Sequence, residues 1–183
     1  SRGAVFACFS ALGVDFMFLE IAFIQKLMRF LHHPVYAVSE VLTTFLEFAG
    51  LGSLFADRRR TRPVQRLARV VVLLLAMSVM YVYLLPYLCQ LGAGWPEIAR
   101  IAASVAALGP LAFLMGIPFP TCLQVLSDRS RGFVPWAWGV NGAASVIGAT
   151  VATLFAVHLG FGSVVGVAGL LYLTVPFSLR RIL

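Results

Sequence analysis

The chain has 183 residues, of which 61% are apolar and 11% are charged, and its mean hydropathy is +0.95. Soluble domains are about 45–50% apolar and about 25% charged, so this composition excludes an ordinary water-soluble globular protein. Intrinsic disorder is excluded as well, because 15 Phe, 5 Tyr and 3 Trp make the chain too apolar to stay solvated. We therefore expect one all-α domain, residues 1–183, embedded in a lipid bilayer.

Six stretches are long and apolar enough to cross a membrane as helices. About 20 mainly apolar residues span about 30 Å of hydrocarbon at a rise of about 1.5 Å per residue. The first stretch is too long for a cleavable signal peptide and lacks a small-residue cleavage site. The chain begins with Ser1 and not Met, which suggests processing, truncation or a piece of a longer polypeptide. The predicted spans cover approximately 4–30, 35–56, 69–91, 98–126, 137–159 and 162–179.

Arginines predict the orientation of these spans. Six of them crowd the connection between the second and third spans, namely Arg58, Arg59, Arg60, Arg62, Arg66 and Arg69. The positive-inside rule places such a loop in the cytoplasm, which accounts for the net charge of +7 without a nucleic-acid partner. Alternation of the spans puts Arg2, Arg129, Arg131, Arg180 and Arg181 on the same side and Lys26, Arg29 and Arg100 on the other. We expect both termini to be cytoplasmic and the protein to lie in a bacterial inner membrane.

Four of the seven carboxylates fall inside the first two spans: Asp15, Glu20, Glu40 and Glu47. Each costs about 2.5–3.5 kcal/mol at the middle of a membrane helix, so each needs a partner or a wet cavity. Glu40 and Glu47 lie about 20° apart around a helix and about 10 Å apart along it, and Tyr36 and Thr43 share their stripe. We expect this stripe to face the protein interior or water, and not lipid.

Two interpretations of these acids stay open. The functional one is a cation or proton site built from Glu20, Glu40 and Glu47, as intramembrane acids serve in transporters. The structural one pairs Glu20 and Glu40 with Lys26, Arg29 or a neighbouring helix.

The fourth span contains Pro110 and then Gly116, Pro118 and Pro120. Each proline removes an amide donor and disturbs the bond to the carbonyl four residues earlier, so we expect the helix to kink or open near residues 106–120. Broken helices expose carbonyl groups at transporter binding sites, although a fixed bend is equally consistent. Small residues predict close helix packing elsewhere, in Gly139, Gly142, Ala143, Ala144, Ser145, Gly148 and Ala149, and in Gly162 with Gly166.

Catalytic and cofactor motifs are absent from the sequence. It contains neither a dinucleotide-binding nor a P-loop glycine pattern, and no GxSxG nucleophile elbow. His32, His33 and His158 have no metal-ligand spacing, and the three cysteines read as small buried hydrophobic residues. We therefore expect no enzymatic activity from this chain alone, no cofactor and no metal.

Five runs of sequence occur in the order found in a known family: residues 16–26, 33–36, 50–54, 116–120 and 135–148. Together they resemble the transmembrane part of the membrane-bound spermidine synthase-like proteins. In that family a Rossmann-type aminopropyltransferase- or methyltransferase-like domain is fused to hydrophobic helices, so the resemblance implies a membrane module that anchors or assists a synthase-like domain. The catalytic half is not part of this chain, and Glu40 and Glu47 depart from the apolar residues expected at their positions.

A second, weaker likeness is to half of a major facilitator superfamily transporter, through six spans and the Gly52 to Arg60 loop. Two functions are therefore expected. The first is a non-enzymatic anchor or accessory subunit whose partners are the lipid bilayer and other membrane subunits or a synthase-like domain. The second is a transport or channel module for protons or organic cations such as polyamines.

Overall fold

The computed structural model describes residues 2–57 and 62–182, and every regular element in these ranges is helical. This confirms the all-α class predicted from composition. In chain order the elements are α1 (Arg2–Leu31), α2 (Pro34–Asp57), α3 (Pro63–Leu91), the 3₁₀ turn η1 (Gly92–Gly94), α4 (Glu97–Met115), α5 (Pro118–Arg129), the 3₁₀ turn η2 (Arg131–Phe133), α6 (Val134–Leu159) and α7 (Phe161–Ile182).

The described residues contain six helical segments long and apolar enough to cross a membrane, with α4 and α5 together forming one of them. The predicted number of spans is thus confirmed. Two spans begin earlier than predicted: α3 at Pro63 and not near 69, and α6 at Val134 and not near 137. In both helices a proline lies in the first turn. Amides of the first turn have no acceptor within the helix, so the missing amide hydrogen of proline costs no helical hydrogen bond.

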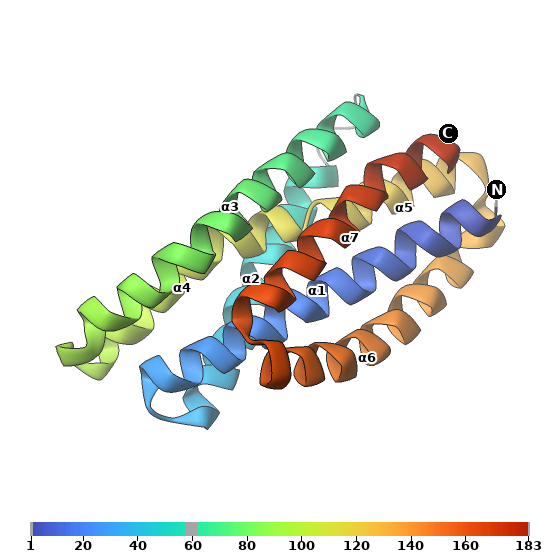
Figure 1. The fold of residues 1–183 in the computed structure, drawn as a ribbon. Helices are drawn as coiled ribbons and strands as arrows, with labels where there is room; N and C mark the ends of the chain where they lie inside the picture. Colours follow the sequence, from blue (N-terminus) through green and yellow to red (C-terminus); the bar gives the residue numbers. More distant parts are fainter. Residues whose placement is uncertain (1, 58–61, 183) are drawn as a thin grey trace.

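Both termini lie at the same end of the bundle (Figure 1). A cavity at this end is lined by Gly3 and Ala4 of α1 and by Ser178 and Arg181 of α7, and the guanidinium of Arg2 lies 5.6 Å from the ring centroid of Phe133. Arg58, Arg59 and Arg60 of the predicted arginine loop lie outside the described residues. The assignment of this end to the cytoplasm stays a prediction from the sequence.

Helix α1 is the central helix and the most buried of the candidate spans. It packs mainly against α6 and α7, with α2 on another side (Figure 1). Phe23 is fully buried and its ring meets those of Phe45 on α2, Tyr81 on α3 and Phe161 on α7 at centroid distances of 6.0, 5.7 and 5.5 Å. Such aromatic contacts supply van der Waals packing between helices, which is what holds a bundle together in lipid.

Four glycines allow backbones to approach closely. A Cβ atom at Gly52 on α2 would meet the carbonyl group of Phe113, and one at Gly116 would meet the backbone of Ala49, so α2 and the end of α4 touch at both points. Gly13 on α1 and Gly148 on α6 play the same part, because a Cβ at either would lie 2.5 Å or 2.9 Å from the backbone of the other helix. Close approach of this kind is the usual role of small residues between membrane helices.

For other glycines the close packing predicted from the sequence is wrong. Gly139, Gly142 and Gly166 have open space where a side chain would be, and at Gly162 a Cβ would make only an ordinary contact of 3.9 Å with Val82. The expected packing role therefore fails for these four positions and holds for Gly148. Small-residue spacing indicates that a face can pack closely, but the neighbouring helices decide which face does.

Candidate functional site

A cavity of about 560 Å³ lies inside the bundle between α2 and α6. These two helices make no extensive contact with each other, and α1 lies between them. The walls also include the junction of α4 and α5 and one residue of α7. Its lining consists of Leu12, Gly13, Phe16, Leu46, Ala49, Gly50, Ser53, Met115, Gly116, Phe119, Pro120, Trp138, Asn141, Ser145 and Tyr172.

The cavity is apolar with a few hydrogen-bonding groups. On α6 the Ser145 hydroxyl donates to the backbone carbonyl oxygen of Asn141 at 2.8 Å. The side-chain amide of Asn141 makes no hydrogen bond in the described part of the chain. The hydroxyl of Ser53 on α2 likewise makes no hydrogen bond to the described residues. None of the described residues that line the cavity is Lys, Arg, Asp or Glu. Its chemistry therefore suits an uncharged group that can accept or donate hydrogen bonds within an apolar envelope.

The helix break forms one wall of this cavity. Helix α4 ends at Met115 and α5 begins at Pro118. The Ile117 amide donates to the Leu114 carbonyl at 3.2 Å, whereas the Gly116 carbonyl loses its helical donor because residue 120 is a proline. The predicted opening is thus located at Gly116–Ile117. Pro110 does not contribute to it, because α4 continues through that residue.

Aromatic rings complete the walls. Phe119 on α5 and Trp138 on α6 meet edge to face at a centroid distance of 4.8 Å, and both line the cavity with Phe16 and Tyr172. In the sequence analysis Trp138 and Asn141 appear only within the family-like run 135–148. Asn141 could have been noticed because its polar amide lies in a stretch of small and apolar residues. Nothing in the sequence indicates that Ser53 lines the same cavity.

Asp15 is the most enclosed of the four intramembrane acids. It is 0% exposed, and neither carboxylate oxygen has a hydrogen-bond partner among the described residues. Asp15 is thus enclosed by packing alone, without the hydrogen-bonding partner that the sequence analysis considered.

Glu20 and Glu40 do not make the ion pairs considered in the structural interpretation. Neither carboxylate lies within 4.0 Å of Lys26, Arg29 or another cation of the described ranges. Glu20 is 5% exposed on α1, and the oxygens of Glu40 are buried without a hydrogen bond, with Thr44 one helical turn further along α2. The two acids belong to different helices, and neither lines the central cavity.

The stripe of Tyr36, Glu40, Thr43 and Glu47 does not pack inside the bundle. Tyr36, Thr43 and Glu47 are exposed on the outer face of α2, and only Glu40 turns its carboxylate inward. Within this chain the interior alternative therefore fails for three of the four residues, while the alternative that they face water stays a prediction. The helical period puts them on one stripe, but the stripe lies away from α1 and α4, against which α2 packs.

The predicted acids do not form a metal centre. Among the described residues, no group of three or more His, Cys, Asp or Glu side chains is arranged to hold a metal ion. Cys8 and Cys122 are buried with their sulfur atoms 3.3 Å apart, and Cys89 is partly buried. The structure thus brings together the helix break, Asn141 and Ser53, and leaves the four acids apart.

The chain matches no protein-family model, and comparison with curated proteins and with solved structures finds no significant similarity.

Proposed function

We propose that this chain is a non-enzymatic membrane module that packs, through the outer face of α2, against a further membrane-embedded part of a larger assembly. The observation that carries this proposal is the position of Glu47. It lies thirteen residues after Pro34 and ten before Asp57, which is about 20 Å and about 15 Å along the helix axis. An exposed carboxylate is therefore held near mid-membrane.

Such a carboxylate is unfavourable against acyl chains. Its cost of about 2.5–3.5 kcal/mol is avoided when a neighbouring helix offers a hydrogen-bond donor or a cation. A second copy joined through the same face would bring two Glu47 carboxylates toward each other, which like-charge repulsion disfavours. The partner is thus a different chain or domain, with an apolar surface that carries a donor or a cation opposite Glu47.

The same partner would also cover one side of the central cavity. Gly50 lies one helical turn from Glu47 on the exposed part of α2 and lines the cavity. The resemblance to the membrane part of spermidine synthase-like proteins supplies a candidate assembly, in which this module anchors a synthase-like domain.

Photo-crosslinking tests this proposal. With a photoreactive residue at Thr43, we expect one protein adduct of defined mass in the native membrane. A label at Val72, which is 62% exposed on α3, should give lipid adducts only. The Thr43 adduct should persist in Glu47→Gln, which keeps hydrogen bonding, and fall at least fivefold in Glu47→Leu, the effect of losing about 1 kcal/mol. Lipid adducts alone at Thr43, or an adduct unchanged in Glu47→Leu, would contradict it.

A second candidate function is transport of a solute, and the helix break on the cavity wall favours it. Broken helices at mid-membrane line the substrate sites of many transporters, and the Gly116 carbonyl is available for such a contact. Because no carboxylate lines the cavity, an uncharged hydrogen-bonding solute fits it better than a polyamine or a proton relay.

Flux measurements address this candidate. In vesicles that contain the protein, Asn141→Leu should lower the flux of a transported neutral solute at least tenfold, because it removes the free amide from the cavity. Val146→Leu on the exposed face of the same helix is the matched control and should leave flux unchanged. Equal flux in the two variants would show that a transported solute does not pass through this cavity.

A further inference from the structure

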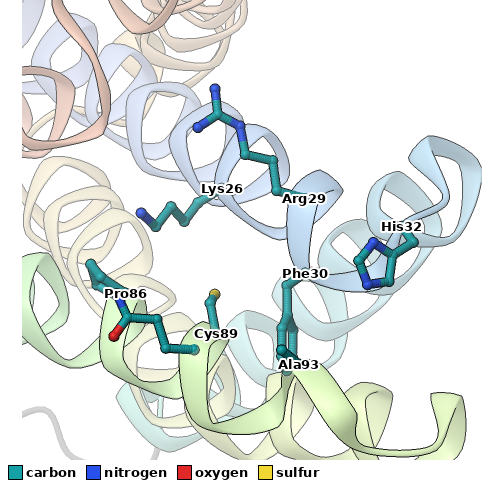
Figure 2. Close-up of a pocket in the computed structure, with 8 residues that line it drawn as sticks. Lys26, Arg29, Phe30, His32, Pro86, Cys89 and Ala93 are labelled. Atoms are coloured by element: carbon teal, nitrogen blue, oxygen red, sulfur yellow. The ribbon is translucent and has the colours of Figure 1, made fainter.

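A second cavity, of about 230 Å³, lies at the end of the bundle opposite the termini, between the last turn of α1 and the end of α3. It is lined by Lys26, Arg29, Phe30, His32, Pro86, Cys89, Gln90 and Ala93. Figure 2 shows Lys26 extending from α1 on the side of Pro86, whereas the Arg29 side chain points away from the α3 residues and His32 lies at the end of α1. The volume is more than seven times the roughly 30 Å³ occupied by a water molecule, which leaves room for an oxyanion.

The cations of this cavity have no anionic partner in the described structure. No carboxylate lies within 4.0 Å of Lys26 or Arg29 in residues 2–57 and 62–182. The Lys26 ammonium is 5.9 Å from the ring centroid of Phe161, a contact that holds the side chain but leaves its charge unneutralised. Arg29 is exposed, so its guanidinium can turn toward a ligand beside Lys26.

Arg100 of α4 fixes the segment that carries these cations. Its Nη1 donates to the Phe30 carbonyl oxygen at 2.9 Å, and its buried Nε has no hydrogen-bond partner among the described residues. His32 then closes α1 in the left-handed conformation, with φ of 60°. The last turn of α1 is thereby anchored to α4.

The depth of the cavity matches the position of lipid phosphates. Both α1 and α3 end beside it, at Leu31 and Leu91, so it lies where a spanning helix meets the headgroup layer. Phe30, Pro86 and Ala93 provide an apolar wall next to the cations. Long basic side chains at such depth reach toward phosphate groups, and Arg binds them through paired donors.

We propose that this cavity is a phosphate-binding site, with Lys26 and Arg29 as the binding groups and Arg100 as the residue that positions them. The ligand is a phosphate oxyanion, either on a lipid headgroup or free in solution. This site is independent of the α2 partner surface and lies on other helices.

Native mass spectrometry of the full chain tests the site. The protein is released from phosphatidylcholine nanodiscs that contain a small fraction of phosphatidylglycerol, and the retained phosphatidylglycerol is counted. Each cation near a membrane surface contributes a little over fivefold to binding of anionic lipid, so the double variant Lys26→Gln, Arg29→Gln should bind about 30-fold less. Arg180→Gln, an exposed cation at the other end of the bundle, should bind as the wild type does.

A parallel titration with inorganic phosphate in detergent distinguishes the two sources. Retention of phosphatidylglycerol with no response to inorganic phosphate assigns the lipid headgroup, and the reverse assigns free phosphate. Lys26→Arg keeps the positive charge and should bind as the wild type does. Binding by this variant would show that the loss in the double variant comes from the missing charges and not from unfolding. The proposal would be overturned if wild type and the double variant bound both phosphatidylglycerol and inorganic phosphate equally, or if Arg180→Gln lost as much binding as the double variant.

Discussion

Placing a methyl group at Gly116 or Gly52 is expected to destabilise the bundle by about 1–3 kcal/mol for each substitution. In Gly116→Ala the new Cβ would collide with the backbone of Ala49, and in Gly52→Ala with the carbonyl group of Phe113. Backbone atoms cannot rotate away as a side chain can, so α2 and α4 must separate. Thermal unfolding of the purified protein in detergent or nanodiscs measures the effect.

Gly50→Ala is the matched control for these two substitutions. Gly50 lies on the same helix as Gly52, and a Cβ at this position meets nothing within 4 Å. Because alanine favours a helix over glycine by about 0.8–1.0 kcal/mol, this variant should be as stable as the wild type or slightly more stable. If all three variants unfolded at the same temperature, the close contact of α2 with α4 would be wrong.

Asp15→Asn is expected to leave the unfolding free energy unchanged or to raise it. The substitution keeps the shape of the side chain and removes the cost of a carboxylate that is 0% exposed and has no partner among the described residues. The gain is at most the roughly 2.5–3.5 kcal/mol that a charged residue costs at mid-helix. Unfolding under the conditions used for the glycine variants provides the measurement.

Thr121→Val is the comparison for Asp15→Asn. The Thr121 hydroxyl is buried and donates to the Ile117 carbonyl oxygen at 2.7 Å, beside the helix break. Removing a made hydrogen bond should lower stability by about 0.5–1.5 kcal/mol, the reverse of the effect at Asp15. A loss in Asp15→Asn as large as that in Thr121→Val would mean that the carboxylate has a partner and would contradict its isolation.

The number of membrane spans was predictable because it depends only on the length of apolar runs. Helix boundaries were predicted less well, since Pro63 and Pro135 can lie inside the first turn of a helix and do not have to precede it. For the fourth span the sequence predicted a kink or opening near residues 106–120, and the break lies between Met115 and Pro118. Its exact place depends on Gly116 touching α2, and Pro110 is tolerated inside α4.

The candidate site was less predictable because it depends on which helices become neighbours. Helical periodicity predicts that Glu40 and Glu47 lie on one stripe, but it says nothing about the direction in which the stripe points. Ser53 and Asn141 are 88 positions apart in the chain and line one cavity only because α1 separates α2 from α6. A single sequence does not indicate which distant residues line the same cavity.

The environment of α2 at mid-membrane tests the central claim most directly. A nitroxide label is attached at Thr43→Cys in a variant without Cys8, Cys89 and Cys122, with Val72→Cys on α3 as the lipid-facing reference. In native membranes a partner against α2 should shield the Thr43 label from both molecular oxygen and a water-soluble nickel chelate, while the Val72 label stays open to oxygen. Equal oxygen access at the two positions, or free access of the nickel chelate at Thr43, would show that lipid or water covers this face and would contradict the proposed partner.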